Sequence, residues 1–348
     1  TVSRASEDFL KIINNHIMEN NMNTMNNMTT SFGGLLLRSP VIVGSCSLTS
    51  RPERCLEYER AGAGAVVIKS IFEEEILAEI DRYDHSFHTE GYDYLRYYQM
   101  ERRLDEYCYI IRRTKALCSI PVIASVCCAT AGAWVSYAGR FEEAGADAVE
   151  LNVMRLESDP VYVDGDLERM HVEMFKAVKH RIEIPVIVKI GHTFTNVIPL
   201  VRRLTFEGAA AVVLFNKMCP VDIDTDTLSF RSADPLSDGK EIHDVLRWVG
   251  LASAKAPSSA ILASGGVLDG DALVKILLAG ATAAEICSVL YKEGPEAISR
   301  MTGRLSDWMA AHKFRSLDEF RGRLDASHHE EGGRFDRIQF YRDISGKS

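Results

Sequence analysis

Eight short apolar segments recur along the chain, and this repetition constrains the fold more than any other feature of the sequence. The segments span 39–46, 61–70, 120–127, 144–153, 184–191, 207–216, 259–266 and 279–288. Each holds about four to six apolar residues, many of them β-branched, and ends in a small or polar residue. Segments that are apolar on both faces are typical of parallel strands buried on both sides. We therefore expect eight parallel strands.

Stretches with helical spacing of apolar residues lie between the apolar segments. Examples are 51–62, 133–145, 167–181, 197–208 and 271–280, and several of them end in Gly, as helices often do. Eight strand–helix units over about 250 residues predict an α/β fold, a (β/α)₈ TIM barrel. The alternative is an open, doubly wound sheet. The number of units and the lack of a G-x-G-x-x-G motif after the first strand favour the barrel.

Three connections are much longer than the joints usual in a barrel. They are 71–99, 154–167 and 217–244, and each follows the carboxyl end of a predicted strand. In a (β/α)₈ barrel that end carries the active site. We therefore expect extended loops at the catalytic face.

Three regions differ in composition along the 348 residues. Residues 1–30 are rich in Asn and Met and lack periodicity, which predicts a flexible amino-terminal extension. Residues 31–324 form the predicted barrel. Residues 325–348 form a charged carboxyl-terminal tail, in which His328 and His329 have no metal-ligand spacing.

Charge and cysteine content exclude several classes of protein. The net charge is −9, from 40 Lys and Arg against 49 Asp and Glu, so we expect no nucleic acid as a partner. No apolar run is long enough for a membrane span, and the amino terminus does not resemble a secretory signal. The eight cysteines form no C-x-x-C pair, so we expect no metal site and reduced thiols in the cytoplasm.

Lysines end two of the predicted strands. Lys69 and Lys189 each follow a buried apolar run. An ammonium group at such a place needs an anion or hydrogen-bond acceptors, although a lysine can also extend from the rim into solvent. Polar residues at most other strand ends, including Ser45, Ser70 and Asn152, favour a binding site.

Small residues end the last two predicted strands. Gly265 and Gly266 follow the seventh strand, and Cys287 and Ser288 follow the eighth. The loops after strands seven and eight, with the helix amino terminus that follows, are the usual phosphate site of this fold. A Gly pair also forms tight turns. The sequence thus predicts a phosphorylated ligand, and Lys69, Lys189, Asn152 and Asn216 are donors suited to a flavin ring.

With these residues in view, the chain from about Ser31 to Leu324 resembles the dihydroorotate dehydrogenase family, especially its soluble class. The resemblance is strongest in ASGGVLDGDALVKILLAGATAAEICSVLYKEGP and FRSLDEFRGRL. It implies a barrel with FMN over the strand carboxyl ends. The residues that it places at the cofactor, together with polar neighbours at the same strand ends, are Ser45, Lys69, Ser70, Asn152, Lys189, Asn216, Gly265, Gly266, Cys287 and Ser288.

The chain departs from the family pattern at the catalytic base. After Glu-Leu-Asn, where the soluble class carries Ser-Cys-Pro-Asn, this sequence continues with Val153, Met154 and Arg155. Arginine stays protonated and cannot act as a base. The family's asparagine-rich substrate loop is replaced by the acidic, tyrosine-rich 71–99. We take Lys69, Asn152, His192 and Cys127 as catalytic candidates, and Cys128 beside them, while loop histidines and paired cysteines are more often structural.

The resemblance implies an FMN-dependent oxidoreductase that converts dihydroorotate to orotate in pyrimidine biosynthesis, here with altered substrate recognition. A small-molecule substrate, a soluble electron acceptor and a homodimer follow from it. Two alternatives stay open. One is a flavin-free lyase or aldolase that uses Lys69 or Lys189 as a Schiff base. The other is a barrel that binds FMN without turnover.

Overall fold

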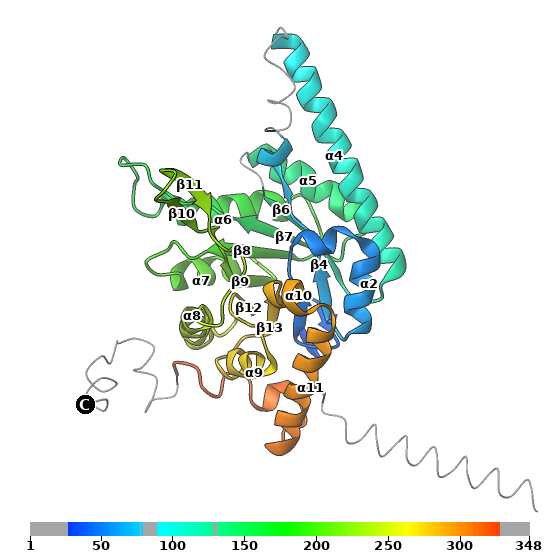
Figure 1. Ribbon diagram of the computed structural model, residues 1–348, viewed down its shortest axis with the longest axis vertical. Coiled ribbons are helices and arrows are strands. Elements are labelled where there is room, and N and C mark those ends of the chain that lie inside the picture. Colours follow the sequence, from blue (N-terminus) through cyan, green and yellow to red (C-terminus); the bar gives the residue numbers. More distant parts are fainter. Residues whose placement is uncertain (1–26, 77, 79–88, 128–130, 328–348) are drawn as a thin grey trace, which may run out of the picture.

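The computed structural model describes residues 27–76, 78, 89–127 and 131–327, and its centre is a closed ring of parallel strands (Figure 1). In ring order the strands are β3 (Val41–Val43), β4 (Ala65–Val67), β6 (Val122–Cys127), β7 (Ala148–Val153), β8 (Val186–Gly191), β9 (Ala211–Asn216), β12 (Ile261–Ser264) and β13 (Ala283–Ile286). Pairing of β4 with β6 closes the ring. The predicted barrel is confirmed, and the open-sheet alternative is wrong.

Burial on both faces explains why the strands were visible in the sequence. Every residue of β6, β7 and β8 is buried, because one face lines the barrel interior and the other packs under helices. A two-residue strand, β5 (Ile71–Phe72), continues beyond β4 and pairs with the end of β6. It extends the sheet on the carboxyl side of Lys69.

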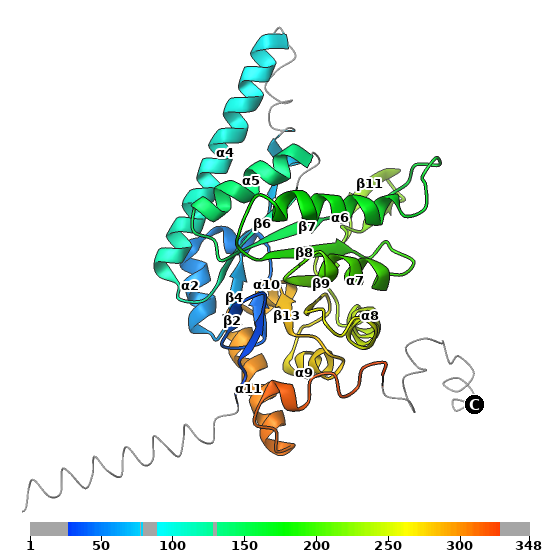
Figure 2. The same cartoon turned by 180° about the vertical axis from the view of Figure 1, so that it is seen from behind.

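Helices surround the ring, as Figures 1 and 2 show from opposite sides. They are α2 (Pro52–Arg60), α4 (Thr89–Leu117), α5 (Ala131–Glu143), α6 (Asp166–Lys179), α7 (Ile198–Phe206), α8 (Ile242–Lys255), α9 (Gly270–Leu278), α10 (Ser288–Glu293) and α11 (Glu296–Ala311). Each of the five predicted helical stretches contains or overlaps one of these helices. The expected connection 71–99 differs in part, because α4 already begins at Thr89 and extends past the barrel rim.

A small hairpin covers the amino-terminal end of the barrel. Strand β1 (Thr30–Phe32) pairs antiparallel with β2 (Leu35–Leu37) through a turn at Gly33 and Gly34. The side chains of Phe32, Leu35 and Leu37 are buried against the residues that fill the barrel interior, among them Ile123, Ile187 and Leu262. This end of the barrel is therefore packed with apolar side chains.

The connection after β9 contains a second hairpin. Strand β10 (Val221–Asp224) pairs antiparallel with β11 (Ser229–Ser232), and most of its side chains are exposed. It projects from the same side of the molecule as the loop between β7 and α6 (Figure 1). The connections predicted to be long thus carry secondary structure of their own.

The predicted terminal regions lie mostly outside the described residues. Of the extension 1–30, only residues 27–30 are described, and Asn27 bridges to Ser316. Of the tail 325–348, residues 325–327 are described, and the amide of Ala326 donates to the carbonyl of Gly250 in α8. Within the described part of the chain, no helix combines the length and apolar character needed to cross a membrane.

Candidate active site

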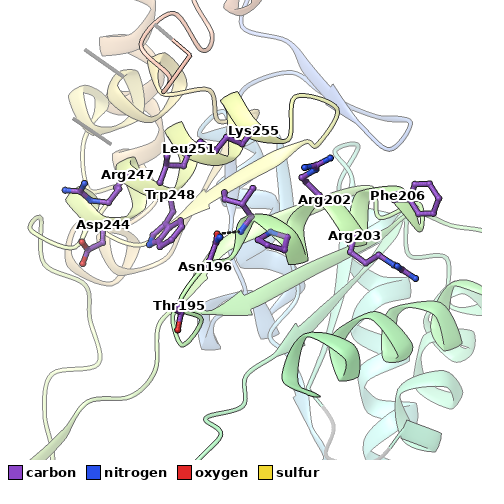
Figure 3. A pocket seen from close by; sticks show the side chains of 12 residues that line it. Thr195, Asn196, Arg202, Arg203, Phe206, Asp244, Arg247, Trp248, Leu251 and Lys255 are labelled. Atoms are coloured by element: carbon purple, nitrogen blue, oxygen red, sulfur yellow. Dashed lines mark hydrogen bonds between the residues drawn. The ribbon is translucent and has the colours of Figure 1, made fainter. Parts of the chain in front are cut away.

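A cavity of about 160 Å³ at the carboxyl ends of the strands brings most of the predicted cofactor residues together. The predicted residues that line it are Ser45, Lys189, Asn216, Gly265, Gly266, Cys287 and Ser288. A larger cavity, about 1370 Å³, lies between α7 and α8 (Figure 3) and is lined by none of the predicted residues. The chemistry suggested by the sequence therefore gathers in the smaller cavity.

The glycine pair after β12 forms a turn beside this cavity. Gly265 and Gly266 have φ of +105° and +70°, in the left-handed region that favours glycine. A Cβ atom on Gly266 would lie 2.3 Å from the backbone nitrogen of Ile242, at the start of α8. Gly266 is therefore needed for the packing of α8 as well as for the turn, which supports the tight-turn interpretation, while the binding interpretation stays a prediction.

The segment after β11 closes one side of the cavity through three hydrogen bonds. The amide of Ser237 donates to Oγ of Ser288 at 2.8 Å. Nζ of Lys217 donates to the carbonyl of Leu236 at 2.8 Å, and Nζ of Lys292 donates to the carbonyl of Ser237 at 3.1 Å. Two ammonium groups thus lie near the hydroxyl of Ser288, which suits an anionic group of a ligand.

A chain of hydroxyl groups crosses the barrel mouth from β3 to β7. Oγ of Ser45 lies 2.9 Å from Oγ of Ser70, which lies 2.8 Å from Oγ of Ser125. Ser125 donates to Oε1 of Glu150 at 3.0 Å. The hydroxyl of Tyr107, from α4, donates to the carbonyl of Ser125 at 2.9 Å and accepts its amide at 2.8 Å. The network holds these strand ends in fixed positions.

Two asparagines connect this network to the cavity. Nδ2 of Asn216 donates to Oδ1 of Asn152 at 2.5 Å, and Nδ2 of Asn152 donates to Oγ of Ser70 at 3.4 Å. Asn152 is buried, whereas Asn216 is partly exposed and lines the cavity. Since an amide offers both donors and acceptors, the pair can recognise a ring with carbonyl and nitrogen atoms.

A buried ion pair lies at the floor of the cavity. Nζ of Lys189 is 2.6 Å from Oε2 of Glu285, and both side chains are almost fully buried. Burial opposes the charge of Lys189, but the carboxylate of Glu285 outweighs it and raises the pKa of the ammonium group. Lys189 is therefore a permanent cation with a carboxylate partner.

Glu150 is a second buried carboxyl group beside this pair. Burial and the charge of Glu285 raise its pKa well above the usual value, while Lys189 and the hydrogen bond from Ser125 oppose the shift. Within the described residues, Oε2 of Glu150 and Oε1 of Glu285 lack a hydrogen-bond donor. One proton held by Glu150 would satisfy both oxygens, because a protonated carboxyl group donates to a carboxylate.

The structure places Lys69 apart from Lys189. Its ammonium group lies 3.2 Å from the carboxylate of Glu75 and 5.5 Å from the ring centre of Phe72. It lines a separate cavity of about 160 Å³ beside α4, together with Ser70 and Tyr107. The two predicted lysines thus face different cavities. Oγ of Ser45, which lines the cavity of Lys189, is 2.9 Å from Oγ of Ser70, which lines the cavity of Lys69.

Two thiols are in hydrogen-bond contact at the rim. A hydrogen bond from Cys287 lowers the pKa of Cys46 to about 7, partly against the effect of burial. The same contact, together with burial, raises the pKa of Cys287. Cys287 also lies 3.7 Å from the carbonyl oxygen of Ser45. At neutral pH the proton of this pair is therefore held mainly by Cys287.

Comparison with known proteins finds relatives over most of the chain. No protein-family model matches the chain. Over 317 residues, 86% of the chain and 99% of the relative, it is 28% identical to the catalytic subunit of dihydroorotate dehydrogenase B (NAD(+)) from Thermoplasma acidophilum. The corresponding protein of Thermoplasma volcanium is 26% identical over 86% of the chain and 98% of its own length. The chain is related to the dihydroorotate dehydrogenases.

A third relative, from Aeropyrum pernix, has a name that includes dihydroorotate dehydrogenase A (fumarate). It is 27% identical over 313 residues, which are 85% of the chain and 96% of that protein. The similarity to dihydroorotate dehydrogenases therefore spans the whole barrel rather than one motif, as the resemblance of the sequence implied.

The candidates for a base differ in what the structure offers them. His192 follows β8, is exposed, and packs edge-on against Phe215 with ring centres 4.6 Å apart. Cys127 is buried at the end of β6, and burial raises the pKa of its thiol to about 12, so it stays protonated near neutral pH. Cys128 lies outside the described residues. His192 is the better placed of the described pair.

Arg155 lies in the loop after β7, in the segment where the resemblance leads one to expect the Ser-Cys-Pro-Asn motif of the soluble class. Its guanidinium group is 3.2 Å from the carboxylate of Glu157, and its side chain is 57% exposed. The carbonyl of Arg155 accepts a hydrogen bond from Thr193, next to His192. The loop after β7 and the loop after β8 are thus in contact, which brings His192 toward this position.

Three residues of the site, Tyr107, Lys217 and Glu285, are not predicted from the sequence. Lys217 directly follows Asn216, and Tyr107 comes from the middle of α4. Glu285 had a signal, since it is the one charged residue in the apolar segment Ala283–Ile286. A buried lysine such as Lys189 requires a counter-ion, and a lone acid in another buried strand is the natural candidate.

Proposed function

We propose that this chain is an FMN-dependent oxidoreductase of the dihydroorotate dehydrogenase type. The observation that carries the proposal is the cavity at the strand carboxyl ends, which gathers Lys189, Asn216, Gly265 and Ser288 in a chain related over most of its length to those enzymes. Ligands of (β/α)₈ barrels bind at this face.

The residues present fit FMN. The cavity is several times larger than the roughly 30 Å³ of a water molecule, so it can hold a phosphate group. Lys217 and Ser288 line it, and Lys292 donates to the carbonyl of Ser237 in its wall. Cations and hydroxyl groups of this kind bind phosphate. Asn152, Asn216 and Lys189 then supply polar partners for the ring. Bound FMN would provide the acceptor for a hydride from the substrate.

Dihydroorotate is the first substrate to test, and an altered substrate is the alternative outcome. The residues around the proposed flavin are kept, whereas the loop that follows Asn152 carries Arg155 in place of a cysteine base. A guanidinium group there would bind a carboxylate of the substrate, and His192 would take the proton. The names of the relatives specify fumarate and NAD(+), so both are acceptors to test.

A Schiff-base lyase is the weaker proposal. A lysine nucleophile must lose its proton. The ammonium group of Lys189 is held by Glu285 and has a raised pKa, and that of Lys69 is paired with Glu75. Neither lysine is therefore activated in the way that Schiff-base chemistry needs.

An absorption spectrum of the purified protein, followed by dihydroorotate without oxygen, tests the proposal. We expect a flavin spectrum that bleaches and recovers with fumarate or NAD(+). A flavin spectrum that dihydroorotate leaves unchanged would point to an altered substrate or to a barrel that binds FMN without turnover. A colourless protein that takes up no added FMN would refute the proposal.

The remaining predictions concern the whole chain. A cytoplasmic location, a homodimer and the division at residues 30 and 324 stay predictions. Light scattering and limited proteolysis of the purified protein would test the last two.

A further inference from the structure

The ammonium group of Lys189, which lines the proposed flavin site, is paired with a carboxylate. Nζ of Lys189 and Oε2 of Glu285 are 2.6 Å apart, and the two side chains are only 6% and 1% exposed. Charges separated from water act over longer distances, because the protein interior screens them weakly. Glu285 therefore cancels most of the field that Lys189 would otherwise place at the cavity.

The third charged residue of this cluster leaves the balance unchanged. Glu150 is fully buried, and burial together with the charge of Glu285 favours its protonated form. Its free oxygen and that of Glu285 have no other donor among the described residues. The net charge of the cluster is therefore zero, because Glu150 is neutral and the charges of Lys189 and Glu285 are opposite.

The titratable groups in contact with the ion pair add no free positive charge, and Lys292, whose ammonium group donates to the carbonyl of Ser237, belongs to the side of the cavity formed by Ser288. Cys287 interacts with both members of the ion pair and has a raised pKa, so its thiol is neutral, and Cys46 lies beyond it. At the rim, Lys217 pairs with Glu241 at 2.7 Å. In the neighbouring cavity, Lys69 pairs with Glu75.

This cancellation has a consequence for the ring of a bound flavin. When a flavin takes up two electrons, its reduced ring either keeps one added proton and stays anionic or takes a second proton at N1 and becomes neutral. An unpaired lysine beside the ring favours the anion, because opposite charges stabilise each other. A pair without net charge in a weakly screened interior does not.

We propose, resting on the function proposed above, that Glu285 sets the charge of the reduced cofactor by neutralising Lys189, so that the reduced flavin is held in its neutral form. The oxidised ring then gains two electrons and two protons. One proton arrives with the hydride from the substrate at N5, and the other reaches N1 from solvent or from the substrate's own released proton. Glu285 is thus a cofactor-tuning residue that the sequence motifs do not indicate.

The pH dependence of the reduction potential of the FMN-loaded protein measures this directly. The potential falls twice as steeply with pH when two protons accompany two electrons as when one does. At alkaline pH free FMN takes up one proton, and we expect the wild-type protein to take up two. A slope of one proton in the wild-type protein would overturn the inference without any variant.

Two variants separate Glu285 from its neighbour. Glu285→Gln alone is ambiguous, because Glu150 could ionise and replace the lost charge, so the test is Glu150→Gln combined with Glu285→Gln. The reduced ring is then the remaining partner for the charge of Lys189, so we expect the reduced double variant to show the absorption spectrum of the anionic ring at alkaline pH, where the wild-type protein shows that of the neutral ring, and to have a more positive potential there. Each tenfold gain in preference for the reduced form corresponds to about 30 mV.

The single variant Glu150→Gln is the matched control. It removes the protonated carboxyl group but keeps the ion pair of Lys189 and Glu285, so its slope should match the wild type. A reduced ring that is neutral by its absorption spectrum in both the wild-type protein and the double variant would overturn the role of Glu285 while leaving the proposed function intact. A protein that binds no FMN would overturn both. If the double variant does not fold, the wild-type slope still decides.

Discussion

Neighbouring charges and burial decide which side chains at the barrel mouth are ionised. Cys127 and Cys46 both end or follow a strand, yet burial raises the pKa of the first to about 12 and a hydrogen bond from Cys287 lowers that of the second to about 7. Burial and the charge of Glu285 raise the pKa of the carboxyl group of Glu150. Two predictions follow at this scale.

Cys46 should be the reactive thiol of the site. Only the thiolate reacts with iodoacetamide, so the alkylation rate at Cys46 should rise with pH around a midpoint near 7. Cys287→Ala removes the hydrogen bond and should move the midpoint to higher pH. Peptide mapping by mass spectrometry measures the rate at Cys46 separately from the other thiols. If the midpoint is the same in this variant, Cys287 does not cause the lowered pKa of Cys46.

Ionisation of Glu150 should lower the free energy of unfolding as pH rises. Its pKa is raised in the folded protein, so the unfolded chain releases this proton at lower pH than the folded one does. The stabilising effect of the bound proton is complete below about pH 4.3 and is lost between there and the folded pKa, by about 1.4 kcal/mol per pKa unit. Glu150→Gln, which mimics the protonated group, should therefore gain in stability relative to wild type as pH rises. Urea unfolding from mildly acidic to neutral pH tests this, and a constant difference would contradict it.

At the scale of elements, the amino-terminal hairpin depends on close contact with the barrel. Gly33 has φ of +54°, and a Cβ atom there would lie 2.4 Å from Cβ of Ala210. Gly34 has φ of +85° but no atom within 4 Å of the same position. A side chain at either glycine would strain the left-handed backbone, but only one at Gly33 would also collide with Ala210. Substitutions at the two positions therefore separate the effect of the collision from that of the backbone.

Gly33→Ala should destabilise the protein more than Gly34→Ala. The left-handed backbone costs an L-residue about 1–2 kcal/mol at either position. The collision with Ala210 should add about 1–3 kcal/mol at Gly33 alone. Chemical unfolding of both variants measures the difference. Equal losses would mean that the hairpin moves away from the barrel end at little cost.

The elements that were predictable are those whose burial leaves a trace in the sequence. All eight barrel strands were located because both of their faces are covered, which gives uninterrupted apolar runs. Hairpin β10–β11 leaves no such trace, since most of its side chains are exposed. The start of α4 lies in a stretch of acidic and tyrosine residues that lacks a clear apolar stripe.

The sequence predicted which residues line the cavity better than it predicted which side chains form ion pairs with one another. The cavity contains Lys189, Asn216, Gly265 and Ser288 because parallel strands end on the same face, which the order of the strands alone dictates. The ion pair of Lys189 and Glu285 joins residues 96 positions apart. The side chain of Lys69 pairs with Glu75, and this contact depends on the conformation of the chain after β4. Side-chain direction of this kind is not fixed by sequence pattern.

For the whole molecule, a bound cofactor should stabilise the barrel. A ligand that binds only the folded chain adds about 2.7 kcal/mol at a concentration 100 times its Kd. We expect FMN to raise the melting temperature of the cofactor-free protein, and riboflavin to raise it less, because riboflavin lacks the phosphate for the cavity near Ser288 and Lys217. Equal effects of the two would contradict the phosphate site.

Among the described residues, the packed amino-terminal end of the barrel leaves the carboxyl-terminal face as the side from which ligands reach the site. The side chains of Phe32, Leu35 and Leu37 pack against the residues of the barrel interior at the amino-terminal end, so this end offers no opening for a ligand among the described residues. If the oxidant and the reductant bind at the same place on this face, they cannot be bound at the same time. The first product then has to leave before the second reactant binds. Such an enzyme would show ping-pong kinetics, with parallel lines in double-reciprocal plots.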